Sequence, residues 1–298
     1  MHFHGFSAFP LTPLLENGCV DTEALGVLLE RIVSAGASSV GFLGSTGTFA
    51  FLSLAERQRA LEAALEALAG RVPLIAGVGA IAERDVLDLA RHAERAGAQG
   101  LLAGPVAYTP LLDPEVTSLY TRLADYTELG LCIYNNPGTT QYHFPIEVIA
   151  KLAKHPRIKG IKMPLPAEGD FAADLQALRA RVGTGLAIGY SGDQGAGAAM
   201  LAGADGFYSA IGGTLPREMA ALCAAGAAGD AARVAELNGA WAPLWALFSE
   251  FGSLRVSHAV ARILDLIETE LPRPLLSLNG ADLARVEAGL DALGALNL

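Results

Sequence analysis

The sequence predicts an α/β protein, a (β/α)8 TIM barrel with a C-terminal helical extension. Three times an amphipathic helical pattern leads through Ala-Gly-Ala into a short apolar run, at residues 35–44, 96–104 and 202–209. Glycine suits the left-handed backbone just past a helix end, and the apolar run suits a parallel strand buried on both faces. Repeated along a chain of 298 residues, such units predict stacked βαβ motifs that close into a barrel.

The remaining elements fall between these three units. Strands are expected at residues 6–11, 40–44, 73–78, 100–104, 130–134, 158–163, 186–190 and 206–209. Helices are expected at residues 22–34, 54–68, 83–95, 114–126, 146–153, 172–181 and 193–201. Ser53 and Glu56 have the spacing of a capping box at the second helix, and Asp113 before Pro114 predicts the start of the fourth.

The pattern changes after about residue 212, where helical segments follow one another without strands between them. These segments cover residues 217–225, 231–250, 254–270 and 281–293. No Ser/Gly-rich or charged linker precedes them. We therefore expect a single domain over residues 1–298, made of a barrel (1–212) and a C-terminal helical extension (213–298).

The composition limits the possible partners. The net charge is −10 and the pI near 5.1, without a basic stripe, which argues against nucleic acid and anionic membranes but not against a small anionic substrate. No apolar run reaches the roughly 18 residues of a membrane helix, and the first ten residues do not resemble a signal peptide. The 52% hydrophobic content predicts a large core and a buried subunit interface.

The cysteines indicate the compartment in which the protein works. Cys19, Cys132 and Cys223 are odd in number and form no CxxC pair. This usage indicates a reducing, cytoplasmic location. We expect neither a cofactor nor a metal.

Lys162 is the most informative single residue. It ends the sixth expected strand, and the active site of such barrels lies at the C-terminal ends of the strands. Strand alternation places Gly160 and Lys162 on one face, so Lys162 points into the barrel if Ile161 points to the helices. Burial disfavours the charged amine and favours the neutral nucleophile. The alternatives are a lysine that extends to solvent or one that pairs with a carboxylate.

Two other strand ends carry polar residues. Residues 44–47 read Gly-Ser-Thr-Gly, a turn whose backbone N–H groups and hydroxyls suit a carboxylate, although many such stretches are only turns. Tyr134 ends the fifth strand before a Pro-Gly turn. Its phenol either relays a proton or packs with a satisfied hydroxyl.

Together these residues resemble the dihydrodipicolinate synthase / N-acetylneuraminate lyase family of class I aldolases. Residues 44–47 are similar to the family's G-[ST]-T-G turn, residues 134–137 to its Y-N-x-P, and residues 160–162 to the G-[IV]-K around its Schiff-base lysine. Residues 191–193 and 202–206 resemble two later family segments. The ordered set covers nearly the whole chain.

The resemblance implies roles for four residues in the chemistry. Lys162 would form the Schiff base and Tyr134 would shuttle protons. Ser45 and Thr46 would bind the carboxylate of a small-molecule 2-oxo acid, with Ser45 also relaying protons. The family resemblance further implies a homotetramer built as a dimer of dimers.

Four more positions would line the substrate pocket. The backbone at Gly192 and Tyr208 would lie beside the imine. Asp193, followed by Gln194, matches a segment that faces the sugar chain in the sialate lyase, or it caps the helix that follows. Thr139 stands where the synthases have an arginine for the carboxylate of the second substrate.

The departures from the family pattern bear on the reaction. Thr139 offers only a neutral hydrogen bond to a carboxylate. Ala107, with Tyr108 next to it, replaces the tyrosine offered to a neighbouring subunit, and Thr48 replaces the usual glutamate. We therefore favour aldol cleavage or dehydration of a hydroxylated 2-oxo (2-keto-3-deoxy) acid. The alternative is 4-hydroxy-tetrahydrodipicolinate synthase, condensing pyruvate with aspartate semialdehyde, for which we would expect an arginine elsewhere, such as Arg255, to reach the site.

Two other classes of function stay open on the sequence. His2 and His4 form an HxH beside the first strand, as in metal-dependent hydrolases, but at the end opposite the expected active face. A non-catalytic 2-oxo acid sensor on the same fold would keep the carboxylate turn. Such a sensor would not need both Lys162 and Tyr134, which are present.

Overall fold

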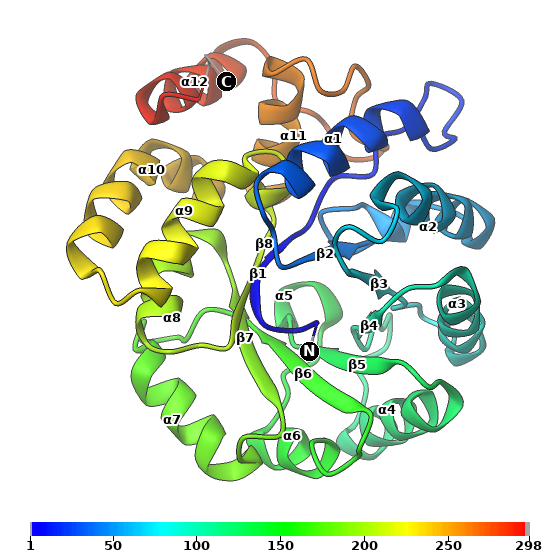
Figure 1. The fold of residues 1–298 in the computed structure, drawn as a ribbon. Helices are drawn as coiled ribbons and strands as arrows, with labels where there is room; N and C mark the ends of the chain where they lie inside the picture. The colour runs from blue at the N-terminus through cyan, green and yellow to red at the C-terminus, as the bar shows by residue number, and fades with distance from the viewer. Residues whose placement is uncertain (1, 296–298) are drawn as a thin grey trace.

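A closed barrel of eight parallel strands forms the centre of the computed structural model, which describes residues 2–295 (Figure 1). The strands are β1 (Gly5–Ala8), β2 (Ser39–Phe42), β3 (Leu74–Gly77), β4 (Gly100–Ala103), β5 (Gly130–Tyr134), β6 (Ile158–Met163), β7 (Ala187–Ser191) and β8 (Gly206–Ser209). Each strand pairs with the next, and β8 pairs with β1. The predicted (β/α)8 barrel is confirmed.

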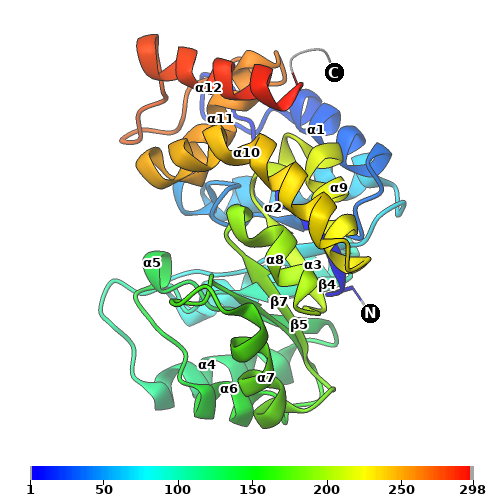
Figure 2. The same cartoon turned by 90° about the vertical axis from the view of Figure 1, so that its left-hand side faces the viewer.

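Helices surround the barrel and connect successive strands (Figures 1 and 2). They are α1 (Thr22–Ser34), α2 (Leu54–Leu68), α3 (Glu83–Ala96), α4 (Asp113–Tyr126), α6 (Ile146–Leu152), α7 (Phe171–Val182) and α8 (Ala196–Leu201). The glycines predicted past three helix ends take left-handed φ angles: +72° at Gly36, +96° at Gly97 and +87° at Gly203.

Four further helices follow β8 with no strand between them, as expected. They are α9 (Pro216–Ala227), α10 (Ala231–Phe251), α11 (Ser253–Ile263) and α12 (Gly280–Leu293). Helix α9 packs on α8, and α10 packs on α9, α11 and α12. Figures 1 and 2 show this group on one side of the barrel, next to α1.

Phe3 closes the amino-terminal end of the barrel. Its side chain lies against glycines on three neighbouring strands, Gly100, Gly130 and Gly160. A Cβ built on any of these glycines would lie 3.0–3.2 Å from Phe3 atoms, so a larger residue would displace the ring. Because this end is filled, a ligand has to enter from the carboxyl ends of the strands.

The first two strands end earlier than the sequence predicts. β1 stops at Ala8 instead of residue 11, because Pro10 has no N–H to give to the ladder. β2 stops at Phe42 instead of residue 44, because Leu43 takes a positive φ of 58°. The end of β2 releases the chain into a loop that lines the site, and Phe9, just after β1, lies against Lys162.

Three helical segments also differ from the prediction. Helix α11 ends at Ile263 instead of residue 270. Two residues later, Asp265 takes a φ of +53°, which a right-handed helix does not allow. The segment predicted as a helix over 193–201 begins with a 3-10 turn, Asp193–Gly195, before α8. A short helix, α5 (Pro137–Thr140), occupies the segment read as a Pro-Gly turn.

The helix caps follow the sequence only in part. Ser53 caps α2 by accepting from Glu56 N at 3.1 Å, but the Glu56 carboxylate accepts from a distant backbone N–H instead of closing the box. At α4 the cap is Leu112, whose N–H donates to Glu115 Oε2 at 2.7 Å. Asp113, expected as the cap, is therefore the first helical residue.

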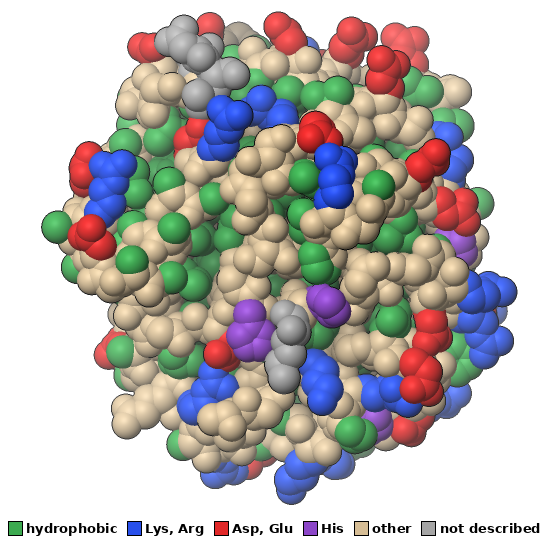
Figure 3. Space-filling model, viewed as in Figure 1, with side chains coloured by type: hydrophobic (Ala, Val, Ile, Leu, Met, Phe, Trp, Pro, Cys, Tyr) green, Lys and Arg blue, Asp and Glu red, His purple; other side chains and the backbone are tan. Residues whose placement is uncertain are grey.

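The surface agrees with the acidic composition. On the face that holds the N-terminus, acidic and basic side chains are interspersed without a continuous basic area (Figure 3). No helix within residues 2–295 is long and apolar enough to cross a membrane.

Candidate active site

A cavity of about 750 Å³ opens at the carboxyl ends of the strands. Its floor is formed by Lys162, Tyr134, Ser45 and Thr46, which lie on or just after β6, β5 and β2. Its far side, which we call the C-terminal wall, is formed by Phe248, Ser249 and residues 251–255 at the junction of α10 and α11. The cavity therefore joins the barrel to the helical extension.

Lys162 points into the barrel, as predicted. Ile161 is fully buried in the core between strands and helices, and Lys162 alternates with it toward the cavity. The Lys162 side chain is 7% exposed, and Nζ lies 3.9 Å from the ring centroid of Phe9 and 4.6 Å from that of Tyr134. No carboxylate within residues 2–295 forms a salt bridge with Nζ, so the ion-paired alternative is not seen.

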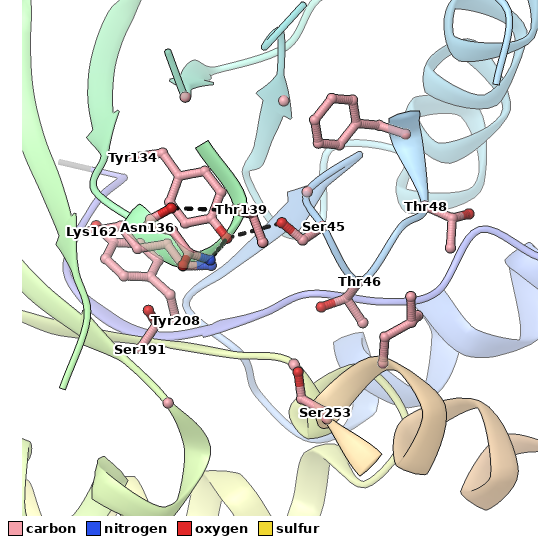
Figure 4. Close-up of a pocket in the computed structure, with 18 of the residues that line it drawn as sticks. Ser45, Thr46, Thr48, Tyr134, Asn136, Thr139, Lys162, Ser191, Tyr208 and Ser253 are labelled. Atoms are coloured by element: carbon pink, nitrogen blue, oxygen red, sulfur yellow. Dashed lines mark hydrogen bonds between the residues drawn. The ribbon is translucent and has the colours of Figure 1, made fainter. Parts of the chain in front are cut away.

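Tyr134 is the centre of a hydrogen-bond network on the floor (Figure 4). Its hydroxyl shares a hydrogen bond with Ser45 Oγ at 3.0 Å and accepts one from Asn136 Nδ2 at 2.7 Å. Burial alone would raise the pKa of Tyr134. The positive charge of Lys162 and the hydrogen bonds outweigh burial, so the pKa of Tyr134 is lowered from its ordinary value. A phenol with a lowered pKa that is hydrogen-bonded to Ser45 can exchange a proton with a group bound in the cavity.

The Gly-Ser-Thr-Gly turn is held tightly by its neighbours. Leu43 before it and Thr48 after it both have positive φ, 58° and 51°. A Cβ at Gly44 would lie 2.9 Å from the Phe9 ring, and a Cβ at Gly47 would lie 3.2 Å from Leu43 Cα. These contacts explain the two glycines and fix the turn that presents Ser45 and Thr46 to the cavity.

Asp193 lines the cavity, but its carboxylate is hydrogen-bonded to other groups of the protein. It is 3% exposed, and it accepts from Ser209 Oγ and, at 3.3 Å, from Ile211 N. Burial raises the pKa of Asp193, although these hydrogen bonds and the charge of Lys162 counteract part of the rise. Of the two interpretations of Asp193, the helix cap is wrong, because its side chain binds groups at the end of β8 and just after it instead.

The other predicted pocket residues also reach the cavity. Gly192 has a φ of +97°, and a Cβ there would lie 2.6 Å from Leu165 Cγ. The Tyr208 hydroxyl points down the barrel and donates to Phe3 O at 3.4 Å, while the residue lines the cavity above. Thr139 is exposed at the mouth. All eight predicted site residues thus border one space.

Sequence reasoning missed Arg57. It is 3% exposed and donates to Gly77 O at 3.0 Å and Gly79 O at 2.9 Å, which fixes the loop after β3. Burial lowers the pKa of Arg57 to about 10, with a smaller opposing effect of Asp85. The available signal was its position on the apolar face of α2, three and four residues before buried Ala60 and Leu61.

Known proteins share the sequence pattern and the fold that build this site. The sequence profile of the dihydrodipicolinate synthetase family matches residues 2–293. The chain belongs to this family. A 4-hydroxy-tetrahydrodipicolinate synthase from Laribacter hongkongensis is 32% identical over 284 residues, covering 95% of this chain and 96% of the relative.

Solved structures agree with that placement. A dihydrodipicolinate synthase from Agrobacterium tumefaciens is 48% identical, with a TM-score of 0.96 and 98% of both chains covered. A chloride-inhibited dihydrodipicolinate synthase from Acinetobacter baumannii, solved with pyruvate, is 29% identical, with a TM-score of 0.90 and coverage of 98% and 99%. The chain is thus a lyase of this family on a TIM barrel with C-terminal helices.

Family membership does not favour the metal-dependent hydrolase considered above. His2 and His4 are exposed and flank Phe3, at the end of the barrel opposite Lys162. Within residues 2–295 no group of three or more His, Cys, Asp or Glu side chains is placed to hold a metal ion.

Proposed function

We propose that Lys162 forms a Schiff base with a 2-oxo acid, and that the enzyme cleaves or dehydrates a hydroxylated 2-oxo (2-keto-3-deoxy) acid. The observation that supports this most is the buried Lys162 amine on the cavity floor, beside the Tyr134–Ser45 pair. Ser45 and Thr46 would hold the substrate carboxylate in the turn between Gly44 and Gly47. Gly192 and Tyr208 would border the imine, and no cofactor is needed.

The proposed steps use only these groups. The Lys162 amine attacks the C2 carbonyl. One amine proton and one proton from Tyr134 pass to the C2 oxygen, which leaves as water. In the resulting iminium ion the C3–C4 bond breaks and its electrons form an enamine, while the C4 hydroxyl gives its proton to the Tyr134 phenolate as the aldehyde departs. Protonation of the enamine at C3 and hydrolysis release pyruvate and restore Lys162. In a dehydratase, the Tyr134 phenolate takes a C3 proton instead and returns it to the C4 hydroxyl, which leaves as water.

The position of Thr139 supports these reactions over condensation with aspartate semialdehyde. Thr139 is exposed at the mouth, and its Oγ1 donates to Asn136 O at 3.4 Å. A neutral hydroxyl at this position offsets little of the cost of removing from water the carboxylate that the synthases bind there. Several relatives at about 32% identity are nevertheless named 4-hydroxy-tetrahydrodipicolinate synthases, so the condensation is the second candidate.

Borohydride trapping tests the covalent step. Incubation with pyruvate and borohydride should add one pyruvate-derived group, which peptide mapping should place on Lys162. Lys162→Met should lose the label. Lys159→Met is a matched control, because Lys159 lies on the same strand but is exposed. A label that persists in Lys162→Met, or that maps to Lys151, Lys154 or Lys159, would refute the assignment.

Product assays distinguish the reactions. A lactate dehydrogenase coupled assay over 2-oxo-3-deoxy sugar acids detects pyruvate release, and a semicarbazide assay detects the new oxo acids formed by dehydration. Condensation of pyruvate with aspartate semialdehyde near a typical kcat of about 10 s⁻¹ would select the second candidate. Binding of 2-oxo acids without any turnover would identify a sensor.

We also propose a homotetramer, built as a dimer of dimers. Ile81 is 72% exposed, Tyr108 87% and Leu112 66%, and all three follow β3 or β4 at the same end of the barrel. Large apolar side chains gathered on one rim are typical of a subunit interface. Sedimentation velocity should give a tetramer. A stable, active monomer at micromolar concentration would overturn the proposal; one solved relative is described as a monomeric variant.

Two smaller proposals concern the whole chain. The barrel and the C-terminal wall together enclose the cavity. We therefore propose that residues 1–298 form one domain. Thermal unfolding should then show a single transition. Cys19, Cys132 and Cys223 are unpaired in the described chain. Free thiols suit a reducing compartment, so we propose a cytoplasmic location, which fractionation of the source cells would test.

A further inference from the structure

The charges that border the cavity are few and have separate tasks. Among the described lining residues, only Lys162, Asp193 and Arg255 carry charged side chains. Lys162 is assigned to the imine, and Asp193 is bonded to Ser209 and Ile211. Arg255, on the C-terminal wall, is therefore the one charged side chain that neither the proposed chemistry nor the packing of the barrel accounts for.

The junction of α10 and α11 places Arg255 in this position. Gly252 links the two helices with a φ of +83°, a conformation that favours glycine, so that the first turn of α11 borders the cavity. Figure 4 shows Ser253, the first residue of α11, on the side of the cavity away from Tyr134. Arg255 is half-buried, and its Nη1 donates to Phe251 O at 3.2 Å, which holds the side chain along the wall.

Arg255 differs from the other arginines of α10, α11 and α12. Arg233 pairs with Glu236, Arg262 with Glu270 and Arg285 with Glu250. Arg255 has no acidic partner within residues 2–295 and donates to a backbone carbonyl. A guanidinium has five N–H groups, so most of its donors remain for a ligand.

We propose that Arg255 binds a second carboxylate at the far end of the substrate, which makes a dicarboxylic 2-oxo-3-deoxy acid the preferred substrate class. This inference rests on the Schiff-base function proposed for Lys162. The first carboxylate lies in the Ser45–Thr46 turn, and the chain of hydroxyl-bearing carbons crosses the cavity toward the wall. Ser253 and Thr139 supply neutral hydrogen bonds to those hydroxyls. The cavity of about 750 Å³ is far larger than the three carbons of pyruvate require.

A carboxylate fits the wall better than other end groups. One guanidinium matches the single charge and the two oxygens of a carboxylate in a bidentate pair. The backbone N–H groups of the first turn of α11 add a favourable partial charge on the same side. A terminal CH₂OH would leave the Arg255 cation without a partner, and a phosphate dianion would require a second cation that the wall lacks among the described residues.

The test compares two six-carbon 2-oxo-3-deoxy acids that differ only in ending with a carboxylate or with CH₂OH. The wild-type enzyme should prefer the dicarboxylate at least 10-fold in kcat/KM. In Arg255→Gln this preference should fall by about 10- to 100-fold, the loss expected for one charge-assisted pair. Arg255→Lys should retain part of the preference. Arg262→Gln is the matched control, because Arg262 lies on the same helix but pairs with Glu270.

The outcomes separate this inference from the proposed function. Failure of pyruvate to label Lys162 in the wild-type protein would remove both. Labelling of Lys162 together with an unchanged preference in Arg255→Gln and Arg255→Lys would overturn only the role of Arg255. A wild-type preference for the CH₂OH compound, or for its terminal phosphate ester, would also overturn it.

Discussion

The floor of the cavity and its C-terminal wall are built in different ways. On the floor, Lys162 is 7% exposed, the Tyr134 hydroxyl has two hydrogen-bond partners, and the adjacent glycines allow no added Cβ without displacement. On the wall, Ser253 and Arg255 are half-buried, and Arg255 has one backbone hydrogen bond. Imine chemistry demands fixed positions, whereas substrate choice tolerates and uses side chains that can change without disturbing the barrel.

The largest effect that tests this comparison is expected on the floor. Tyr134→Phe removes the proton donor while keeping the ring against Lys162, so kcat should fall by about 10²- to 10⁴-fold. Imine trapping with pyruvate should become slower without being lost, because the amine is still present. Steady-state kinetics and borohydride labelling measure the two effects.

The wall supplies the control for that prediction. Ser253→Ala removes a hydroxyl of the same cavity that has no contact with Tyr134 in Figure 4. Its kcat with the preferred substrate should stay within about threefold of wild type, because a lost hydrogen bond to a remote hydroxyl of the substrate should chiefly raise KM. Unchanged turnover in Tyr134→Phe would remove the phenol from the mechanism, and an equal loss in both variants would abolish the distinction between floor and wall.

The same contrast explains how much could be predicted from the sequence. The floor depends on local rules: strand alternation turns Lys162 inward, and glycines mark the turn that holds Ser45. The barrel depends on a repeated pattern and was predicted with small errors at the ends of strands. By contrast, the wall depends on how the helical extension packs, and no local pattern shows that Gly252 brings Arg255 to the cavity.

Tertiary hydrogen bonds account for the other differences. The sequence leaves Asp193 as either a helix cap or a residue that faces the substrate, but its carboxylate accepts from Ser209 Oγ and Ile211 N, at the end of the neighbouring strand β8 and just after it. The sequence shows Asn136 only as the variable position of the Y-N-x-P pattern, because its hydrogen bond to Tyr134 depends on the turn of α5. Such partners lie far apart in the sequence or depend on a tight turn, which periodicity does not encode.

A second prediction concerns stability on the wall side. His258, on α11, is 5% exposed, and burial with a smaller effect of Arg262 lowers its pKa to about 4, against opposing effects of Glu270 and the Thr269 backbone. An unfolded histidine titrates near 6.5. Between these values only the unfolded chain binds the proton, so the free energy of unfolding should fall as the pH falls from 6.5 to 4, by up to about 3 kcal/mol.

Urea unfolding at pH 7, 5.5 and 4 measures that loss. His258→Gln should reduce the difference in unfolding free energy between pH 7 and 4, whatever the variant's stability at pH 7. His4→Gln, which changes an exposed histidine, serves as the control. The same pH dependence in wild type and His258→Gln would show that protonation of His258 does not cause the loss of unfolding free energy.

The smallest expected effect is a change in pyruvate affinity, which should depend on the floor of the cavity and not on the C-terminal wall. Ser45→Ala removes the hydroxyl that faces both the proposed carboxylate site and Tyr134 Oη, 3.0 Å away. One lost hydrogen bond should weaken pyruvate binding by about 3- to 10-fold, measured as the pyruvate concentration for half-maximal imine trapping. The hydrogen bond from Ser45 also helps to lower the pKa of Tyr134. In Ser45→Ala that pKa should therefore rise, and the limb of the kcat/KM profile that depends on Tyr134 should move to higher pH.

The control is Ser253→Ala, which should change neither the affinity for pyruvate nor this pH dependence, because Ser253 lies on the opposite wall. If Ser45→Ala kept the wild-type affinity for pyruvate, the carboxylate would have to lie elsewhere, and the direction in which the longer substrate crosses the cavity would have to be reassigned.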